Sequence, residues 1–141
     1  MTMPLRIYVD FNGCVSSPRD RNRKAVVLDT MGSLRDLCNA GVILSEGLPL
    51  IGFDWSEENE DIEVHGLAQY DVEQKWWIIE FDDIGFRDVP TGNRTPIIEF
   101  RCVSCQSDLT KQIKAKGLQL GDVCQHCGTP VHAPIAPPAT D

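Results

Sequence analysis

The chain has no long hydrophobic run and no recognised catalytic motif. No apolar stretch approaches the length of a membrane span, and residues 1–9 alternate apolar and polar residues instead of building the centre of a signal peptide. We therefore expect a cytoplasmic protein that does not enter a membrane. The sequence also lacks a nucleophile elbow, a Gly-rich phosphate loop and a His-rich metal motif. We expect no catalytic residues, no small-molecule substrate and no enzymatic activity.

Positive charge is scarce, and it is unevenly spread. The 141 residues carry a net charge of -8. Residues 1–99 hold nine Lys and Arg against eighteen Asp and Glu, whereas residues 100–141 hold four against three. An acidic body weakens any general affinity for nucleic acid, because binding to the phosphate backbone requires clustered cations. A hydrophobic fraction of 42% is nevertheless typical of a globular chain.

Four of the six cysteines form a pattern that predicts a metal site. They are Cys102, Cys105, Cys124 and Cys127. Their spacing, C-x2-C-x18-C-x2-C, lies in the range of structural zinc sites, and four thiolates complete a tetrahedral shell with no open position for catalysis. We therefore expect one structural Zn²⁺. The alternatives are iron, as in rubredoxin-like electron carriers, a disulfide or redox pair, and a ligand role for His126 or His132.

The second cysteine pair carries a family resemblance. The stretch GDVCQHCGTP at 121–130 resembles a knuckle of the zinc ribbon superfamily, with Gly128 directly after the pair. The first pair is followed by Gln106 and lacks that glycine. The resemblance covers about residues 97–132 and implies metal binding, not an activity, because zinc ribbons occur in transcription, translation, nucleic-acid enzymes and adaptors.

The segment between the cysteine pairs is predicted to be basic. Residues 109–116 form either a short helix or one arm of a hairpin. Lys111, Lys114 and Lys116 give this segment a positive face, which is either simply solvated or a contact for nucleic acid or an acidic partner. Because so short a module has only a small hydrophobic core, we expect metal binding to supply most of its folding free energy.

The N-terminal region reads as mainly β with one short helix. Apolar residues alternate through 5–11, 62–70 and 77–81, and further strands are expected at 25–29 and 48–55. The short connection 71–75 predicts an antiparallel hairpin, and a helix is predicted at 33–40 with Cys38 in the core. We expect a small SH3-like or OB-like β-barrel at 1–84, a linker at 85–96, the zinc-ribbon module at 97–132 and a flexible tail at 133–141.

Two further features are candidates for partner binding. Adjacent residues on a strand point to opposite faces, so a core position for Trp77 turns Trp76 outward, either to a partner or under a neighbouring part of the chain. The loop between the first two strands contains Arg19, Arg21, Arg23 and Lys24.

These features favour a non-enzymatic adaptor. In this hypothesis the zinc is purely structural and the chain contacts a protein partner. The alternative is a nucleic-acid-binding protein, which would use the Arg19–Lys24 loop and the Lys111–Lys116 face.

Overall fold

The residues that the structure describes form one seven-stranded sheet with two α-helices above it. The computed structural model describes residues 4–57, 60–90, 99–116 and 122–131, without the side chains of 55–57 and 116. In chain order the elements are β1 (Leu5–Tyr8), η1 (Phe11–Gly13), β2 (Cys14–Ser16), β3 (Lys24–Val27), α1 (Met31–Ala40), β4 (Pro49–Glu57), β5 (Glu60–Asp71), β6 (Trp76–Phe81), β7 (Arg87–Pro90) and α2 (Thr110–Lys116).

The described strands form an open sheet. Their order is β1-β4-β5-β6-β3-β2, with β7 paired to β5 beyond the end of β6. The pairs are antiparallel except for β1 and β4. The predicted β5–β6 hairpin is confirmed, with Asp71 opposite Trp76. Because β1 and β2 end the order without pairing to each other, the sheet is not closed, and a barrel is not shown.

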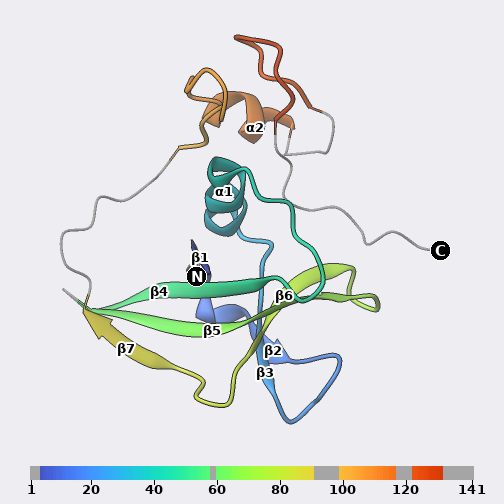
Figure 1. Cartoon of the computed structure of the whole chain (residues 1–141), viewed down its shortest axis with the longest axis vertical. Helices are drawn as coiled ribbons and strands as arrows, with labels where there is room; N and C mark the ends of the chain where they lie inside the picture. The colour runs from blue at the N-terminus through green and yellow to red at the C-terminus, as the bar shows by residue number, and fades with distance from the viewer. Residues whose placement is uncertain (1–3, 58–59, 91–98, 117–121, 132–141) are drawn as a thin grey trace.

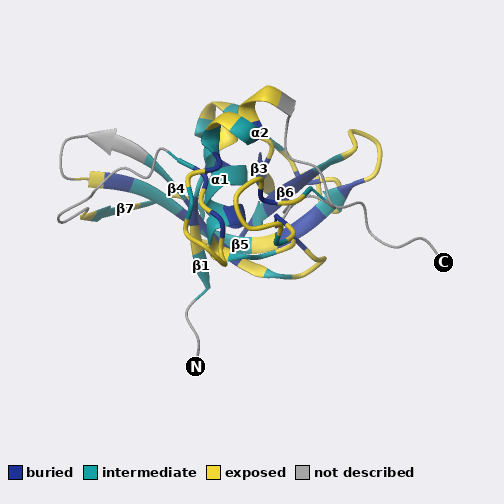
Figure 2. Ribbon diagram, turned by 90° about the horizontal axis from the view of Figure 1, so that it is seen from above, coloured by how far each residue is buried: buried dark blue, intermediate teal, exposed yellow. Residues whose placement is uncertain are grey.

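Three parts of the chain lie in tiers. The sheet is at the bottom of Figure 1, α1 is in the middle, and α2 with the two cysteine loops is at the top. The view from above places both helices over the sheet (Figure 2). The described part of the chain contains no helix that is long and apolar enough to cross a membrane.

Strand alternation places the main core on the α1 side of the sheet. Trp77 is 1% exposed there, as predicted, and Leu37 of α1 packs against the same cluster. The other buried members are Ile7, Val9, Val26, Leu28, Leu44, Leu50, Val64, Ala68, Ile79 and Phe81. A smaller cluster on the opposite face contains Ala25, Val27 and Ile78, with Val15 and Trp76 against it.

Helix α1 begins earlier than predicted. Thr30 is the N-cap, and its hydroxyl accepts a hydrogen bond from the backbone N–H of Ser33. The helix therefore starts at Met31, two residues before the predicted start at Ser33. Gly41 ends the helix at a φ of 68°, which suits glycine. Leu37 faces the main core, whereas Leu34 and Cys38 face a second core above the helix. The helix is therefore covered on two sides.

Two strands occur where the sequence predicted irregular segments. Strand β2 lies in the predicted loop, and it is only three residues long, too short to show an alternating pattern. Strand β7 lies in the predicted 85–96 linker and pairs with β5 in register from Glu63–Arg87 to Glu60–Pro90. Residues 91–96 and the predicted tail at 133–141 lie outside the described residues.

Candidate metal centre

The four predicted cysteines meet at one point. Their sulfur atoms all lie within 4.8 Å of one another, and no disulfide forms between them. The Sγ–Sγ distance is 3.7 Å between Cys102 and Cys127 and 3.8 Å between Cys105 and Cys124. A tetrahedral zinc with Zn–S bonds of about 2.3 Å separates its sulfurs by about 3.8 Å. The sulfurs are therefore spaced for a tetrathiolate metal ion.

Two copies of one loop structure supply the ligands. Residues 101–109 and 123–131 share the same sequence of buried and exposed positions, shifted by 22 residues. The first loop is closed by a hydrogen bond from Cys102 N to Ser107 O of 3.0 Å, and the second by one from Cys124 N to Thr129 O of 2.8 Å. Each loop therefore presents one buried and one exposed cysteine, and we call the two loops knuckle 1 and knuckle 2.

Backbone groups in each knuckle point at the sulfurs. The N–H groups of Ser104 and Cys105 lie 3.4 and 3.5 Å from Cys102 Sγ, and the N–H of His126 lies 3.3 Å from Cys124 Sγ. Such donors stabilise thiolates, the form that binds metal. Both knuckles turn through a left-handed residue, Gly128 at a φ of 76° and Gln106 at 64°. Knuckle 1 thus adopts the same turn without the glycine, at a conformational cost.

The exposed cysteines each lie beside a hydroxyl group. Cys105 Sγ lies 3.1 Å from Ser107 Oγ, and Cys127 Sγ lies 3.2 Å from Thr129 Oγ1. Side-chain and backbone hydrogen bonds between Cys105 and Ser107 lower the pKa of Cys105 to about 6, and those between Cys127 and Thr129 lower the pKa of Cys127. Burial raises the pKa of Cys124. The two exposed positions therefore favour the thiolate.

Cys38 lies near the centre but outside the ligand group. It is 1% exposed, and burial, with the nearby Cys102, raises its pKa to about 11. This confirms Cys38 as a core residue. The core is the one shared by α1 and the knuckles, which also contains Phe100, Cys102, Leu109, Ile113, Cys124 and Val131. Two of the four predicted ligands are thus part of the hydrophobic contact with α1.

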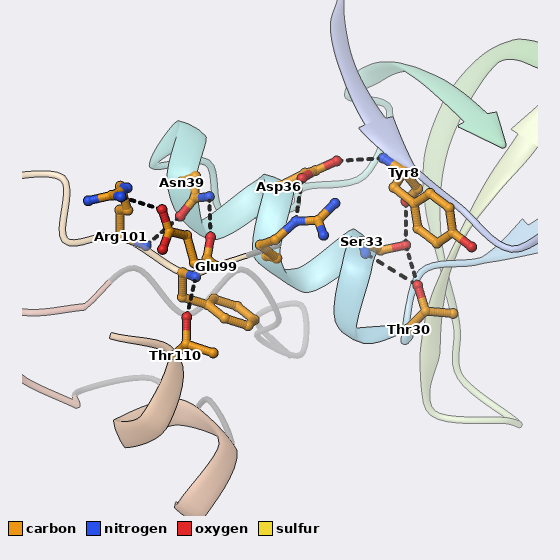
Figure 3. A network of polar contacts seen from close by, with 10 residues as sticks. Tyr8, Thr30, Ser33, Asp36, Asn39, Glu99, Arg101 and Thr110 are labelled. Carbon is orange, nitrogen blue, oxygen red and sulfur yellow. Dashed lines mark hydrogen bonds and ion pairs between the residues drawn. The ribbon is translucent and has the colours of Figure 1, made fainter. Parts of the chain in front are cut away.

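Asn39 fixes the knuckles to α1 (Figure 3). Its Nδ2 donates to Glu99 O at 3.0 Å, and its Oδ1 accepts from Arg101 N at 2.7 Å. At the other end of the helix, Ser33 Oγ donates to Tyr8 O and Asp36 Oδ2 accepts from Tyr8 N, so α1 bridges β1 and the knuckle region. No sequence pattern marked Asn39, since an asparagine near a helix end has several common roles.

The predicted helix, rather than a hairpin arm, forms in the described part of the inter-knuckle segment, at residues 110–116. This is α2, and Ile113 points into the shared core while Lys111 and Lys114 are exposed. Gln112 joins α2 to knuckle 2, because its Nε2 donates to Val123 O and its Oε1 accepts from Gln125 N. Among the described side chains, neither lysine makes an ion pair; the Lys116 side chain lies outside them.

The other predicted basic segment lies at the opposite end of the molecule. The β2–β3 loop is at the bottom of Figure 1, and α2 is at the top. Arg19 donates to Gln69 at 3.1 Å, and Arg23 donates to Phe81 O and pairs with Asp83 at 2.8 Å. Arg21 and Lys24 are exposed. Arg19 and Arg23 therefore hold the loop onto the sheet, and the structure does not bring the two basic segments together.

Trp76 is half-buried on the sheet face away from α1. It packs against the Ala25, Val27 and Ile78 cluster, and its Nε1 is buried without a hydrogen-bond partner. The prediction that it faces away from the main core is confirmed. Its predicted contact with a partner remains a prediction.

Strand β5 carries an ion-pair network that no sequence pattern marked. Asp61 is 1% exposed and pairs with Arg6 of β1 across the sheet. Arg6 also pairs with Glu63 at 3.0 Å, and Glu63 lies 2.9 Å from His65 Nε2. Burial alone would raise the pKa of Glu63, but the hydrogen bonds from His65 and Arg6 outweigh it and hold that pKa below its usual value.

Comparison with known proteins adds no likeness. No family model, no curated protein and no solved structure matches the chain. The metal centre is therefore interpreted from its own geometry.

Proposed function

We propose that the chain is a non-enzymatic zinc-binding adaptor whose C-terminal part is a zinc-ribbon-like module. The observation that carries the proposal is the spacing of the four sulfurs, with cross-knuckle distances of 3.7 and 3.8 Å. Thiolate ligands in a tetrahedral arrangement select zinc among the common cellular metals, and iron remains the chemical competitor. A purified protein without visible colour would argue against iron.

The role of the zinc in this proposal is structural. All four positions of the shell are taken by cysteine, which leaves none for water or a substrate. Cys102 and Cys124 are also buried members of the core that packs against α1. Metal binding would therefore stabilise both the knuckles and their contact with the helix.

The adaptor role is supported by the separation of two surfaces with different charge. The sheet is formed by the acidic N-terminal region, and the exposed Lys111 and Lys114 lie on α2 at the far end of the molecule. Two such surfaces suit a protein that contacts partners, and electrostatic complementarity would select them. Trp76 is the candidate aromatic contact on the sheet side.

A capture experiment tests the protein-partner proposal. Zinc-loaded protein is used to capture partners from its own cell lysate, with and without nuclease treatment. A defined protein that survives nuclease, and is lost with Trp76→Ala, supports the proposal. Trp76→Phe is the matched control, since the Nε1 of Trp76 makes no hydrogen bond that phenylalanine would lose. A partner that disappears with nuclease would contradict the proposal.

Nucleic-acid binding is the second candidate function. The exposed lysines of α2 are better candidates for this contact than the arginines of the β2–β3 loop. Lys111 and Lys114 have no carboxylate partner among the described residues, whereas Arg19 and Arg23 are held by the sheet. Lys111→Ala with Lys114→Ala should then abolish binding to a single-stranded oligonucleotide. Arg21→Ala should leave that binding unchanged. Unaltered binding by the lysine variant would exclude this candidate.

A further inference from the structure

The metal centre is open to solvent on one side only. Cys105 and Cys127 are exposed, whereas Cys102 and Cys124 are 3% and 1% exposed. The exposed sulfur of each knuckle lies next to the buried sulfur of the other, at 3.8 Å for Cys105–Cys124 and 3.7 Å for Cys127–Cys102. Each sulfur that solvent can reach therefore has a buried sulfur of the other knuckle as its neighbour.

We propose that Cys105 and Cys127 are oxidation sites for hydrogen peroxide and that their oxidation expels the zinc and releases the knuckles from α1. This inference rests on the proposed zinc function. Oxidation of thiolates follows their exposure, and two of the four sulfurs can be reached without any opening of the fold. The hydroxyl groups of Ser107 and Thr129 lie at hydrogen-bonding distance from the same two sulfurs.

The chemistry needs one peroxide molecule for each disulfide. The thiolate sulfur of Cys105 attacks one peroxide oxygen, the O–O bond breaks, and the departing hydroxide takes a proton to become water. The buried thiolate of Cys124 then attacks the resulting sulfenic acid, forming the S–S bond and releasing a second water after protonation. Two electrons pass from the two sulfurs to peroxide, and Zn²⁺ leaves because only two thiolates remain. Cys127 and Cys102 react in the same way.

Oxidation is coupled to the fold through the shared core. Cys102 and Cys124 pack with Phe100, Leu109 and Ile113 in the cluster that also contains Cys38 of α1. The two disulfides keep the knuckles joined to each other, but they close sulfur separations of 3.7 and 3.8 Å to bonds of about 2.05 Å. This moves Cys102 and Cys124 within the cluster and weakens its packing against α1. Cys38 would then become accessible to an alkylating reagent, whereas the separate main core around Trp77 and Leu37 stays intact.

The test uses the full zinc-loaded chain with the substitution Cys14→Ser. This substitution removes the one partly exposed thiol outside the metal centre among the described residues. Zinc content is measured first; hydrogen peroxide is then added, zinc release is followed with a chromogenic chelator, and modified cysteines are mapped by mass spectrometry. We expect sulfenic acid, trapped at short times with dimedone, to form on Cys105 and Cys127 at least about tenfold faster than on the buried pair. Cross-knuckle disulfides should follow, and alkylation of Cys38 should rise as zinc is released.

Histidine variants provide the matched control. Cys105→His and Cys127→His keep a zinc ligand that peroxide does not convert to a disulfide, so together they should bind zinc and resist its release. Equal sulfenic acid formation on all four sulfurs, disulfides within a knuckle, or zinc release without Cys38 alkylation would each overturn the inference. Zinc bound at one equivalent with any of these results leaves the proposed function standing. A chain that binds no zinc would overturn both.

Discussion

Asn39 joins α1 to knuckle 1 through both ends of its amide. Asn39→Ala removes a donor to Glu99 O and an acceptor for Arg101 N. We expect a loss of about 1–3 kcal/mol in the stability of the contact between α1 and the knuckles. Hydrogen exchange of residues 99–116 would measure it, with Gln74→Ala in the exposed hairpin turn as the control. Unchanged exchange in the Asn39 variant would show that the hydrophobic cluster alone holds the contact.

The two knuckles have different residues at their equivalent left-handed position, and substitutions there should act in opposite directions. Gln106→Gly relieves a left-handed non-glycine residue, while Gly128→Ala introduces one at a φ of 76°. Each change should alter the free energy of unfolding of the zinc-loaded protein by about 1 kcal/mol, stabilising for the first and destabilising for the second. Chemical denaturation compares them. The same sign for both would contradict the repeat relationship between the knuckles.

Glu63 should make stability depend on acid pH. Its folded pKa lies below its usual value, so its contribution is present above about pH 4.3 and is lost as the pH falls through the lower folded value. Glu63→Gln should therefore destabilise the protein at pH 7 and have a smaller effect at pH 3. Urea denaturation of both proteins at the two pH values gives the difference. A difference that does not shrink at pH 3 would refute this role.

At the scale of elements, α1 is the part that connects two cores. Leu37→Ala should destabilise the sheet by about 2–5 kcal/mol, because Leu37 is fully buried in the main core. Ile113→Ala should act on the knuckle region, since Ile113 lies in the shared core. Residue-resolved hydrogen exchange separates these effects. If both substitutions expose the same amides, the two clusters do not behave as separate units.

The sequence predicted the elements with strong local patterns. Alternation identified the β5–β6 hairpin and the burial of Trp77, and cysteine spacing identified the residues that meet at the centre. It missed β2 and β7, which are short and depend on pairing with distant strands. It also placed Cys38 in a core, but it did not show that Leu37 and Cys38 of the same helix pack into different cores. A helical period shows which residues share a face of the helix. It does not show that residues of one face pack into two different cores.

At the scale of the whole molecule, the proposed function implies a sheet that is stable by its own core and a knuckle region that depends on metal. Chelation of the zinc should leave the β-sheet circular dichroism signal intact. It should increase hydrogen exchange in residues 99–116, 122–131 and 34–39. Exchange in β4, β5 and β6 should stay slow, because these strands contribute to the main core. Cooperative loss of all protection on chelation would contradict this division.

The central claim is that four cysteines bind one structural zinc. Its most direct measurement is the metal content of the purified chain together with X-ray absorption at the metal edge. We expect one zinc per chain with four sulfur ligands at about 2.3 Å. Absence of metal, an iron signal, or a nitrogen or oxygen atom among the ligands would contradict it.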